Sequence, residues 1–205
     1  MLFMSDIHGH LAALNAVLED AKKHDVTEFY VAGDLVFGGE DSLNVWRRLM
    51  ELKAKLIRGT SDIALASLNV ASLTGKDPAR IALLEHTRKS LGEIIVKNIG
   101  RLPDEHRGPL VDGSEFLMVH GSPKDPMTEI TVDMDDSEVI ALLDDDPADI
   151  VLCGSSHVPF QRDVEGVRLI GLGSVGQAPE GRFAHYTVLT STLSGTIVEQ
   201  ASVEY

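Results

Sequence analysis

Metal-ligand side chains follow a short apolar run at the start of this 205-residue chain. The run Leu2-Phe3-Met4 leads into Ser5-Asp6-Ile7-His8-Gly9. In an extended backbone, side chains two residues apart point the same way, so the Asp6 carboxylate and the His8 imidazole can reach one point beyond a strand end. Such a pair suits a metal ion. Gly9 permits a sharp turn into a helix whose N-terminus favours anions such as phosphate.

Taken alone, this motif fits two interpretations. The first is the metal site; the second is an Asp that caps a helix and a His that packs against its first turn. The second interpretation weakens because four more polar motifs of this kind follow apolar runs further along. They are A-G-D-L-V at 32–36, R-G-T-S-D at 58–62, V-H-G-S-P at 119–123 and G-S-S-H-V-P at 154–159. Ligands gather at the carboxyl ends of strands in α/β sheets, so this repeated placement is informative.

The elements that must position these motifs alternate between strands and helices. Apolar periodicity predicts strands at 2–4, 28–32, 54–57, 116–119 and 150–153, with helices at 11–23 and 42–52. The tail is β-rich, with further strands predicted at 160–163, 167–172, 184–190 and 196–203. Alternating β and α followed by β alone predicts an α/β fold of two packed sheets with helices outside.

The stretch from Asp62 to Ile99 looks helical, and we interpret it as a helical insertion that covers the site and shapes its pocket. Asp77 before Pro78 has the pattern of a helix start, and Ser90 with Glu93 has capping-box spacing for a separate helix. The loop residue His106 has no partner pattern and is expected at the surface. The acidic stretch 133–149 is interpreted as a solvated helix with acidic caps.

Length and composition indicate one domain, residues 1–205, with 43% hydrophobic and 24% charged residues. The net charge of -14 argues against binding of duplex nucleic acid. It leaves room for a small phosphorylated substrate, because bound cations can supply the positive charge.

The single cysteine, Cys153, excludes an internal disulfide, and no run is long enough for a membrane span, so a cytoplasmic location is expected. Edge strands of the sheets could pair two copies, which leaves a homo-oligomer open.

Together, the five motifs resemble those of the calcineurin-like metallophosphoesterase superfamily, which run D-x-H, G-D, G-N-H-D or a close variant, a lone His, and G-H-x-H. The resemblance spans nearly the whole chain, and Gly173-Ser174-Val175-Gly176-Gln177 is similar to small single-domain bacterial members. It implies a four-layer α-β-β-α sandwich of two mixed sheets, with a two-metal centre where the strand-end loops meet.

Position by position, the resemblance implies that Asp6, His8 and His157 bind a first divalent ion, Asp34 bridges both ions, and His120 binds the second. Asp34 and His120 are thereby the implied catalytic residues. The implied reaction is attack of metal-activated hydroxide on phosphorus. These ligand types suit manganese, iron, zinc or nickel, so the sequence does not select the metal.

The chain departs from the family pattern at Thr60, Ser61 and Ser155. Thr60 and Ser155 replace an Asn and a His that bind the second ion, and Ser61 replaces a His that protonates the leaving group. A hydroxyl is a poor ligand beside an imidazole, so we expect one firmly bound ion and a weak or empty second site. His10 and Asp62 are nearby candidates for compensating roles, with helix capping or packing as the alternative for each.

The candidate substrate-binding residues are Arg58, whose guanidinium suits anionic oxygens, and Ser155. The function expected from these residues is hydrolysis of a small phosphomonoester, phosphodiester or nucleotide. The alternative is a catalytically impaired relative that binds metal or a phosphate ligand in a regulatory role. A metal hydrolase acting on amides or sugars is a third, weaker interpretation.

Overall fold

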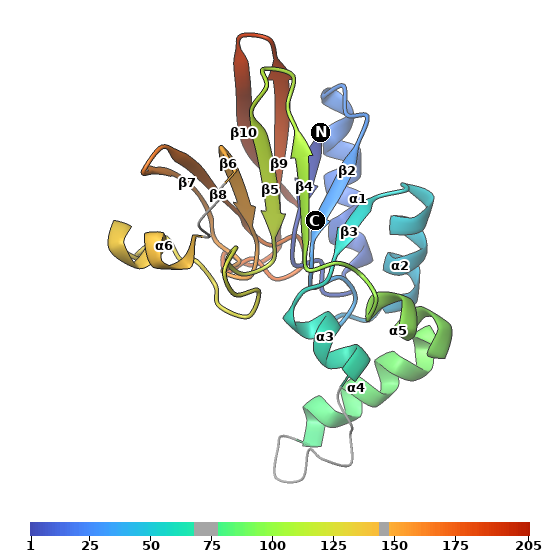
Figure 1. Ribbon diagram of the computed structural model, residues 1–205. Helices are drawn as coiled ribbons and strands as arrows, with labels where there is room; N and C mark the ends of the chain where they lie inside the picture. Colours follow the sequence, from blue (N-terminus) through green and yellow to red (C-terminus); the bar gives the residue numbers. More distant parts are fainter. Residues whose placement is uncertain (68–77, 144–147) are drawn as a thin grey trace.

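Two five-stranded sheets face each other in the computed structural model, which describes residues 1–67, 78–143 and 148–205 (Figure 1). The first sheet has the order β10 (Gly195–Glu204), β9 (Phe183–Thr192), β1 (Leu2–Met4), β2 (Phe29–Ala32) and β3 (Lys55–Ile57). The second has the order β4 (Glu105–Pro109), β5 (Glu115–Val119), β6 (Ile150–Cys153), β8 (Val167–Leu172) and β7 (Pro159–Val164). Both sheets are mixed, which confirms the predicted fold class.

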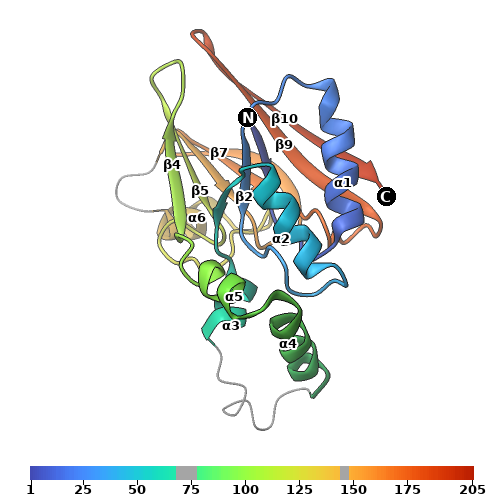
Figure 2. The same ribbon diagram turned by 90° about the vertical axis from the view of Figure 1, so that its right-hand side faces the viewer.

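Helices cover the outer faces of the sandwich (Figures 1 and 2). The helices α1 (Leu11–Asp20) and α2 (Ser42–Glu51) lie against the first sheet, with a short 3-10 turn (Ala21–Lys23) after α1. Helix α6 (Asp136–Leu142) lies against the second sheet. Helices α3 (Thr60–Ser67), α4 (Pro78–Leu91) and α5 (Glu93–Ile99) form the predicted helical segment beyond one end of the sheets.

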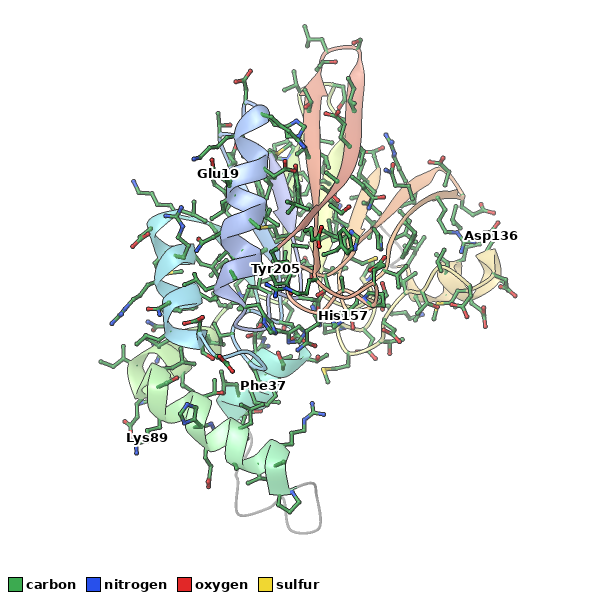
Figure 3. The ribbon with its side chains drawn as sticks, turned by 180° about the vertical axis from the view of Figure 1, so that it is seen from behind. Glu19, Phe37, Lys89, Asp136, His157 and Tyr205 are labelled. Atoms are coloured by element: carbon green, nitrogen blue, oxygen red, sulfur yellow. The ribbon has the colours of Figure 1, made fainter. Side chains whose placement is uncertain are left out.

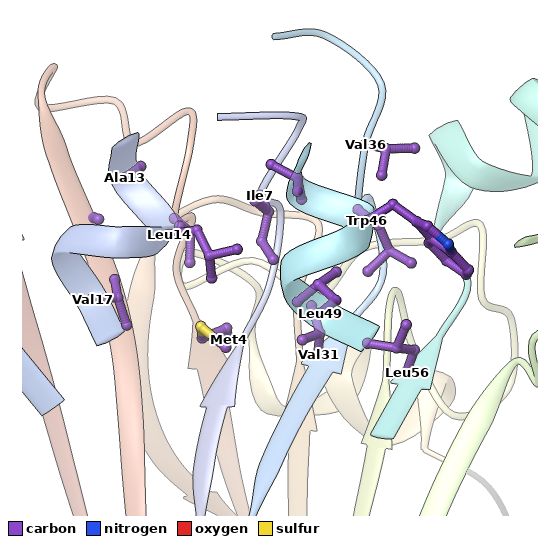
Figure 4. Close-up of a cluster of buried hydrophobic side chains, with 14 of the residues drawn as sticks. Met4, Ile7, Ala13, Leu14, Val17, Val31, Val36, Trp46, Leu49 and Leu56 are labelled. Atoms are coloured by element: carbon purple, nitrogen blue, oxygen red, sulfur yellow. The ribbon is translucent and has the colours of Figure 1, made fainter. Parts of the chain in front are cut away.

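The alternation of side chains along each strand divides the core into layers. In β1, Leu2 and Met4 face the helices while Phe3 faces the second sheet. Figure 4 shows Met4 beside Leu14 and Val17 of α1. In β5 the same alternation places Phe116 and Met118 between the sheets. Burying apolar side chains of this size stabilises the fold by about 1.5–3 kcal/mol each, so the layered core fixes the strand register.

Parallel pairing brings the motif loops to one edge of each sheet. Met4 pairs with Val31 and Ala32 with Ile57, so β1, β2 and β3 end together. In the second sheet Val119 pairs with Cys153, and β5 and β6 also end together. Hydrogen bonds of 3.1 Å from the Asp6 N-H to the Gly33 carbonyl and of 2.9 Å from Gly154 to His120 link loops within each sheet. The five loops therefore converge at one end of the sandwich.

Two local expectations are corrected by the structure. His106 lies in the edge strand β4, not in a loop. The capping box of Ser90 and Glu93 does not form, because Gly92 occupies the N-cap of α5 and the Ser90 hydroxyl donates to the Thr87 carbonyl. A capping box instead starts α6, from Asp135 and Glu138. The expected cap at position 77 and part of the acidic stretch, 144–147, lie outside the described residues.

Candidate metal centre

Three of the predicted ligands converge at one point, although they lie up to 151 positions apart in the chain. The Nε2 atom of His157 lies 3.3 Å from Oδ1 of Asp6 and 3.3 Å from Nε2 of His8. The His8 Nε2 atom is 3.7 Å from the same Asp6 oxygen. The three potential ligand atoms lie within 4.8 Å of one another, which is close enough to share one cation. The structure thus brings together the three residues predicted for the first ion.

Asp34 connects this group to His120. Its Oδ2 atom lies 3.7 Å from Nε2 of His8, and its Oδ1 atom lies 3.5 Å from Nε2 of His120. Asp6, Asp34 and His120 form a second group whose potential ligand atoms lie within 4.8 Å of one another. Asp34 thus lies between His8 and His120. The structure also places Asp6 with Asp34 and His120, the two residues that the sequence predicted for the second ion.

The backbone sets the tautomer of all three histidines. Nδ1 of His8 lies 2.9 Å from the Phe37 carbonyl, and Nδ1 of His120 lies 2.7 Å from that of Ala32. Nδ1 of His157 lies 3.0 Å from the Gln177 carbonyl. A carbonyl only accepts, so each Nδ1 carries the proton and donates it, and in the neutral ring Nε2 keeps its lone pair. The three lone pairs are thus on the atoms that converge.

Two polar atoms at this point are buried without a hydrogen-bond partner: Oδ1 of Asp6 and Nε2 of His120. Both residues are fully buried. Buried polar atoms are almost always hydrogen-bonded, because leaving one without a partner costs about 1–3 kcal/mol. A carboxylate oxygen and an imidazole nitrogen are the donors that divalent transition metals use. The residues present therefore fit a metal ion, which would satisfy both atoms.

Four of the five predicted ligands have left-handed backbone conformations. The φ angles are 55° at Asp6, 49° at His8, 52° at Asp34 and 59° at His157. In non-glycine residues such conformations are uncommon and persist where the surrounding structure fixes them, typically at functional sites. The fold therefore holds these loops in backbone conformations of higher local energy, and these conformations direct the ligand side chains to the cluster.

The charges of the cluster shift the titration of its members. Burial raises the pKa of Asp6, but the imidazole of His157, whose Nε2 lies 3.3 Å from Oδ1, and the charge of His120 outweigh burial, and the net pKa falls below its usual value. The His157 pKa is raised, chiefly by the neighbouring Asp6 carboxylate. Burial lowers the pKa of His120, but the Asp34 carboxylate outweighs it and the net pKa rises. Paired carboxylates and imidazoles of this kind mark a site that attracts cations.

Asp62 holds two of the loops together. Its fully buried carboxylate accepts hydrogen bonds of 2.9 Å from the Gly59 N-H and 3.2 Å from the Leu35 N-H. Burial and the nearby Asp34 raise its pKa to about 7. These contacts agree with the alternative interpretation of Asp62, in which its side chain has a capping or packing role. His10 occupies the N-cap position of α1 but makes no capping hydrogen bond.

The three positions that depart from the family pattern all lie at the cluster. The Thr60 hydroxyl is 3.4 Å from Oδ2 of Asp34, and the Ser61 N-H donates to Oδ1 of Asp34 at 2.8 Å. The Ser155 N-H donates to Oδ2 of Asp6 at 3.0 Å. The Ser61 hydroxyl is buried and has no hydrogen-bond partner. Thr60 and Ser61 begin α3, so the first turn of this helix supports the Asp34 carboxylate.

Arg58 is the one predicted site residue that the structure does not bring to the cluster. Its guanidinium binds Asp104 through two hydrogen bonds of 2.6 Å and 2.9 Å and also donates to the Gly100 carbonyl. It lines a separate hollow with residues of α3 and α5. The predicted role in substrate binding would require this ion pair to open.

A hollow of about 460 Å³ lies beside the cluster. His8 and Asp34 form part of its wall, and the remaining wall includes Phe37, Ser61, Arg80, Leu83 and Gln177. Figure 3 shows Phe37 and His157 on the side where α4 approaches the sandwich. Residues of α4 therefore form part of the wall of this hollow.

Sequence reasoning missed the contributions of Arg80 and Gln177. Gln177 contacts the site twice, because its carbonyl accepts from His157 and its side chain lines the hollow. Its position in the Gly173–Gln177 motif was a usable signal, since that motif already stood out. Arg80 had no comparable signal, because a single arginine in an amphipathic helix is ordinary.

The comparisons with known proteins agree with this geometry. A family model described as the calcineurin-like phosphoesterase superfamily domain matches residues 1–194. An uncharacterized protein of Methanocaldococcus jannaschii is 29% identical over 175 residues, which cover 84% of this chain and 68% of that protein.

Two solved structures show the fold. A hypothetical protein from Pyrococcus horikoshii OT3 superimposes with a TM-score of 0.86 at 22% identity, covering all of this chain and 88% of that one. A metallophosphoesterase from Sphaerobacter thermophilus superimposes with a TM-score of 0.77 at 24% identity, covering all of this chain and 87% of that one. Across the described residues, every helix is too short or too polar to cross a bilayer.

Proposed function

This chain belongs to the calcineurin-like phosphoesterase superfamily, and on that premise we propose that it is a metal-dependent phosphoesterase acting on a small phosphomonoester, phosphodiester or nucleotide. The observation that carries the proposal is that two buried atoms, Oδ1 of Asp6 and Nε2 of His120, have no hydrogen-bond partner. Both lie where three imidazoles and two carboxylates converge. Such an arrangement is costly without a cation and favourable with one.

The proposed division of labour follows the two residue groups. Asp6, His8 and His157 hold a first ion, and Asp34 and His120 hold a second, with Asp34 between them. Divalent ions held there would neutralise charge on the phosphoryl oxygens and lower the pKa of a bound water. The backbone carbonyls of Phe37, Ala32 and Gln177 keep the imidazoles oriented, so that little reorganisation is needed when substrate arrives.

We propose that the second ion is held more weakly than the first. Thr60 and Ser155 offer hydroxyls where relatives offer an amide and an imidazole, and the Ser155 N-H is engaged with Asp6. Asp6 approaches both groups and partly offsets this loss. A hydroxyl at position 61 is also a poor general acid, so esters with good leaving groups should be hydrolysed best.

A second candidate function is binding of metal or a phosphate ligand without turnover. Ser61 favours it, because among the described residues no side chain lies within hydrogen-bond distance of its buried hydroxyl to activate it. General-acid assistance typically raises the rate of hydrolysis about 10²- to 10⁴-fold, so its loss alone would leave a slow enzyme. Only a measurement of turnover distinguishes such an enzyme from a binding protein.

The test is hydrolysis of bis(p-nitrophenyl) phosphate by the purified chain with manganese. Asp34→Ala should abolish turnover, since it removes the carboxylate between His8 and His120. Asp25→Ala removes an exposed carboxylate elsewhere and should leave turnover unchanged. Absence of turnover with every divalent metal tried, alongside retained phosphate binding, would favour the second candidate.

We further propose a cytoplasmic location and a working ion that is manganese, iron, zinc or nickel. The single cysteine is buried, and burial raises the pKa of the Cys153 thiol to about 12, so it stays unreactive. Metal content after purification without added metal, and activity across manganese, iron, zinc and nickel, test the choice of ion.

A further inference from the structure

We propose that Arg80, on the first turn of α4, binds a second phosphoryl group of the substrate, and that the natural substrate is a nucleotide-sized phosphate ester carrying two phosphoryl groups. This inference rests on the proposed function, because it assigns the part of the substrate that the metal ligands do not hold. Arg80 and the ligands His8 and Asp34 line the same hollow.

The size of the hollow argues for a substrate larger than one phosphate. Its volume of about 460 Å³ lies within the range of pockets that hold small-molecule ligands. Phe37 and Leu83 give part of its wall an apolar character that suits the flat body of a nucleoside. A single phosphoryl group at the metal ligands would leave most of this space unfilled.

The charge of the hollow argues for a second anion. The chain carries a net charge of -14, so its overall field repels phosphate esters. Arg80 is the only lysine or arginine among the described residues that line the hollow. A planar guanidinium matches phosphate oxygens with two parallel hydrogen bonds. Arg58, the cation that the sequence suggested for this role, lines a separate hollow and is bound to Asp104.

A neighbouring group at the hollow also favours an anion. Helix α4 begins at Pro78, so the positive end of its dipole lies beside the hollow, where Ala79 and Arg80 line the wall. Ser61 lines the wall too, but its hydroxyl oxygen is buried, so the helix terminus is the neighbouring group that favours an anion there.

Helix α4 holds Arg80 in place through its buried face. Leu84, Thr87 and Leu91 are buried against the neighbouring helices, and Nε of Arg88 donates to the Leu65 carbonyl of α3 at 2.6 Å. The first turn of α4 therefore has a defined position relative to α3, which itself supports Asp34. Arg80 is placed as a specificity-determining residue rather than as a metal ligand.

The test compares two esters with the same leaving group and the same scissile bond: thymidine 5′-(p-nitrophenyl phosphate) and its 3′-phosphorylated counterpart. With manganese and the full chain, the wild type should show a KM about tenfold lower for the 3′-phosphorylated ester, with similar kcat. Arg80→Met should raise the KM of the 3′-phosphorylated ester about tenfold, with a smaller rise for the parent ester, and so remove the preference, because the lost contact stabilises the bound substrate and the transition state equally. Arg80→Lys should keep part of the preference.

A matched control lies on the same helix. Lys89→Met removes one positive charge from an exposed position, which Figure 3 shows at the far end of α4 from Phe37. It should leave both KM values unchanged. Circular dichroism of each variant shows that its helices are intact.

Binding of thymidine 3′,5′-bisphosphate and thymidine 5′-phosphate, measured by calorimetry, gives the same comparison without turnover. If neither ester is hydrolysed but Arg80→Met loses a wild-type preference for the bisphosphate, the proposed function is wrong, and the assignment of Arg80 as the residue that binds a second phosphoryl group stands. If the esters are hydrolysed but the wild type shows no preference, or Arg80→Met and Lys89→Met behave alike, the inference is overturned and the proposed function stands.

Discussion

Replacing Asp62 with alanine should destabilise the protein and loosen its site together. The Asp62 carboxylate is the acceptor for two buried backbone N-H groups, one in the loop after β2 and one in the loop after β3. Each donor left without an acceptor costs about 1–3 kcal/mol, so the loss is about 2–6 kcal/mol. Burial and the nearby Asp34 raise the pKa of Asp62 to about 7, so the ionised Asp62 carboxylate is unfavourable in the folded protein. Its removal offsets part of this cost. This offset is largest at pH 7 and above and shrinks below the raised pKa, so at pH 5 we expect a net loss of about 1–4 kcal/mol.

The assay is urea unfolding followed by circular dichroism at 25 °C and pH 5, with a chelator present so that metal binding does not contribute to stability. Asp104→Ala is the control, because it removes a carboxylate whose side chain is 47% exposed and paired with Arg58. Exposed ion pairs contribute about 0–1 kcal/mol, so this variant should stay near the wild type. A free energy of unfolding for Asp62→Ala within about 1 kcal/mol of the wild type would refute the assignment of Asp62 as the link between the loops.

Three further predictions concern the second ion, the packing around Asp34 and the pH dependence of stability. Thr60→Asn with Ser155→His should raise the metal content from about one to about two ions per chain, measured by inductively coupled plasma mass spectrometry; an unchanged content would contradict the ligand assignment. Gly59→Ala should weaken metal binding, seen as a lower affinity in a manganese titration, because a Cβ there would overlap the Asp34 carboxylate and approach Cε1 of His120 at 2.8 Å. Tyr186→Phe should cost about 1 kcal/mol at pH 7, because the Tyr186 hydroxyl donates to Asp20 at 2.6 Å. That hydrogen bond holds the pKa of Asp20 below its ordinary value of 3.8, so its contribution is complete above that pH and disappears as the pH falls through the lowered pKa. Urea unfolding at pH 7 and pH 3 checks this, and an equal cost at both values would contradict it.

Much of the fold could be predicted because strands and ligand motifs coincide in this chain. Strands β1 and β6 run over the predicted residues, since each is a short apolar run ended by a turn motif. Strand β4 could not be predicted, because its sequence Glu-His-Arg-Gly-Pro is polar and contains glycine and proline, which an edge strand tolerates. The tail strands were predicted, but not that β7 and β8 join one sheet while β9 and β10 join the other.

The candidate site could be predicted as a set of residues, but not as a set of contacts. The five ligand positions followed from the resemblance of the strand-end motifs to those of the family, and the structure brings these residues together. The tautomers could not be predicted, since they depend on the carbonyls of Phe37 and Gln177, which only the fold brings to the rings. The pairing of Arg58 with Asp104 was equally out of reach, because it joins loops 46 positions apart.

Anomalous diffraction from crystals grown with manganese would locate the ions bound by the strand-end loops. We expect a strong peak at bonding distance from Nε2 of His8, Nε2 of His157 and the Asp6 carboxylate, with a weaker peak beside His120 and Asp34. A manganese-containing crystal without a peak at any of these atoms would contradict the claim that the strand-end loops form a metal centre.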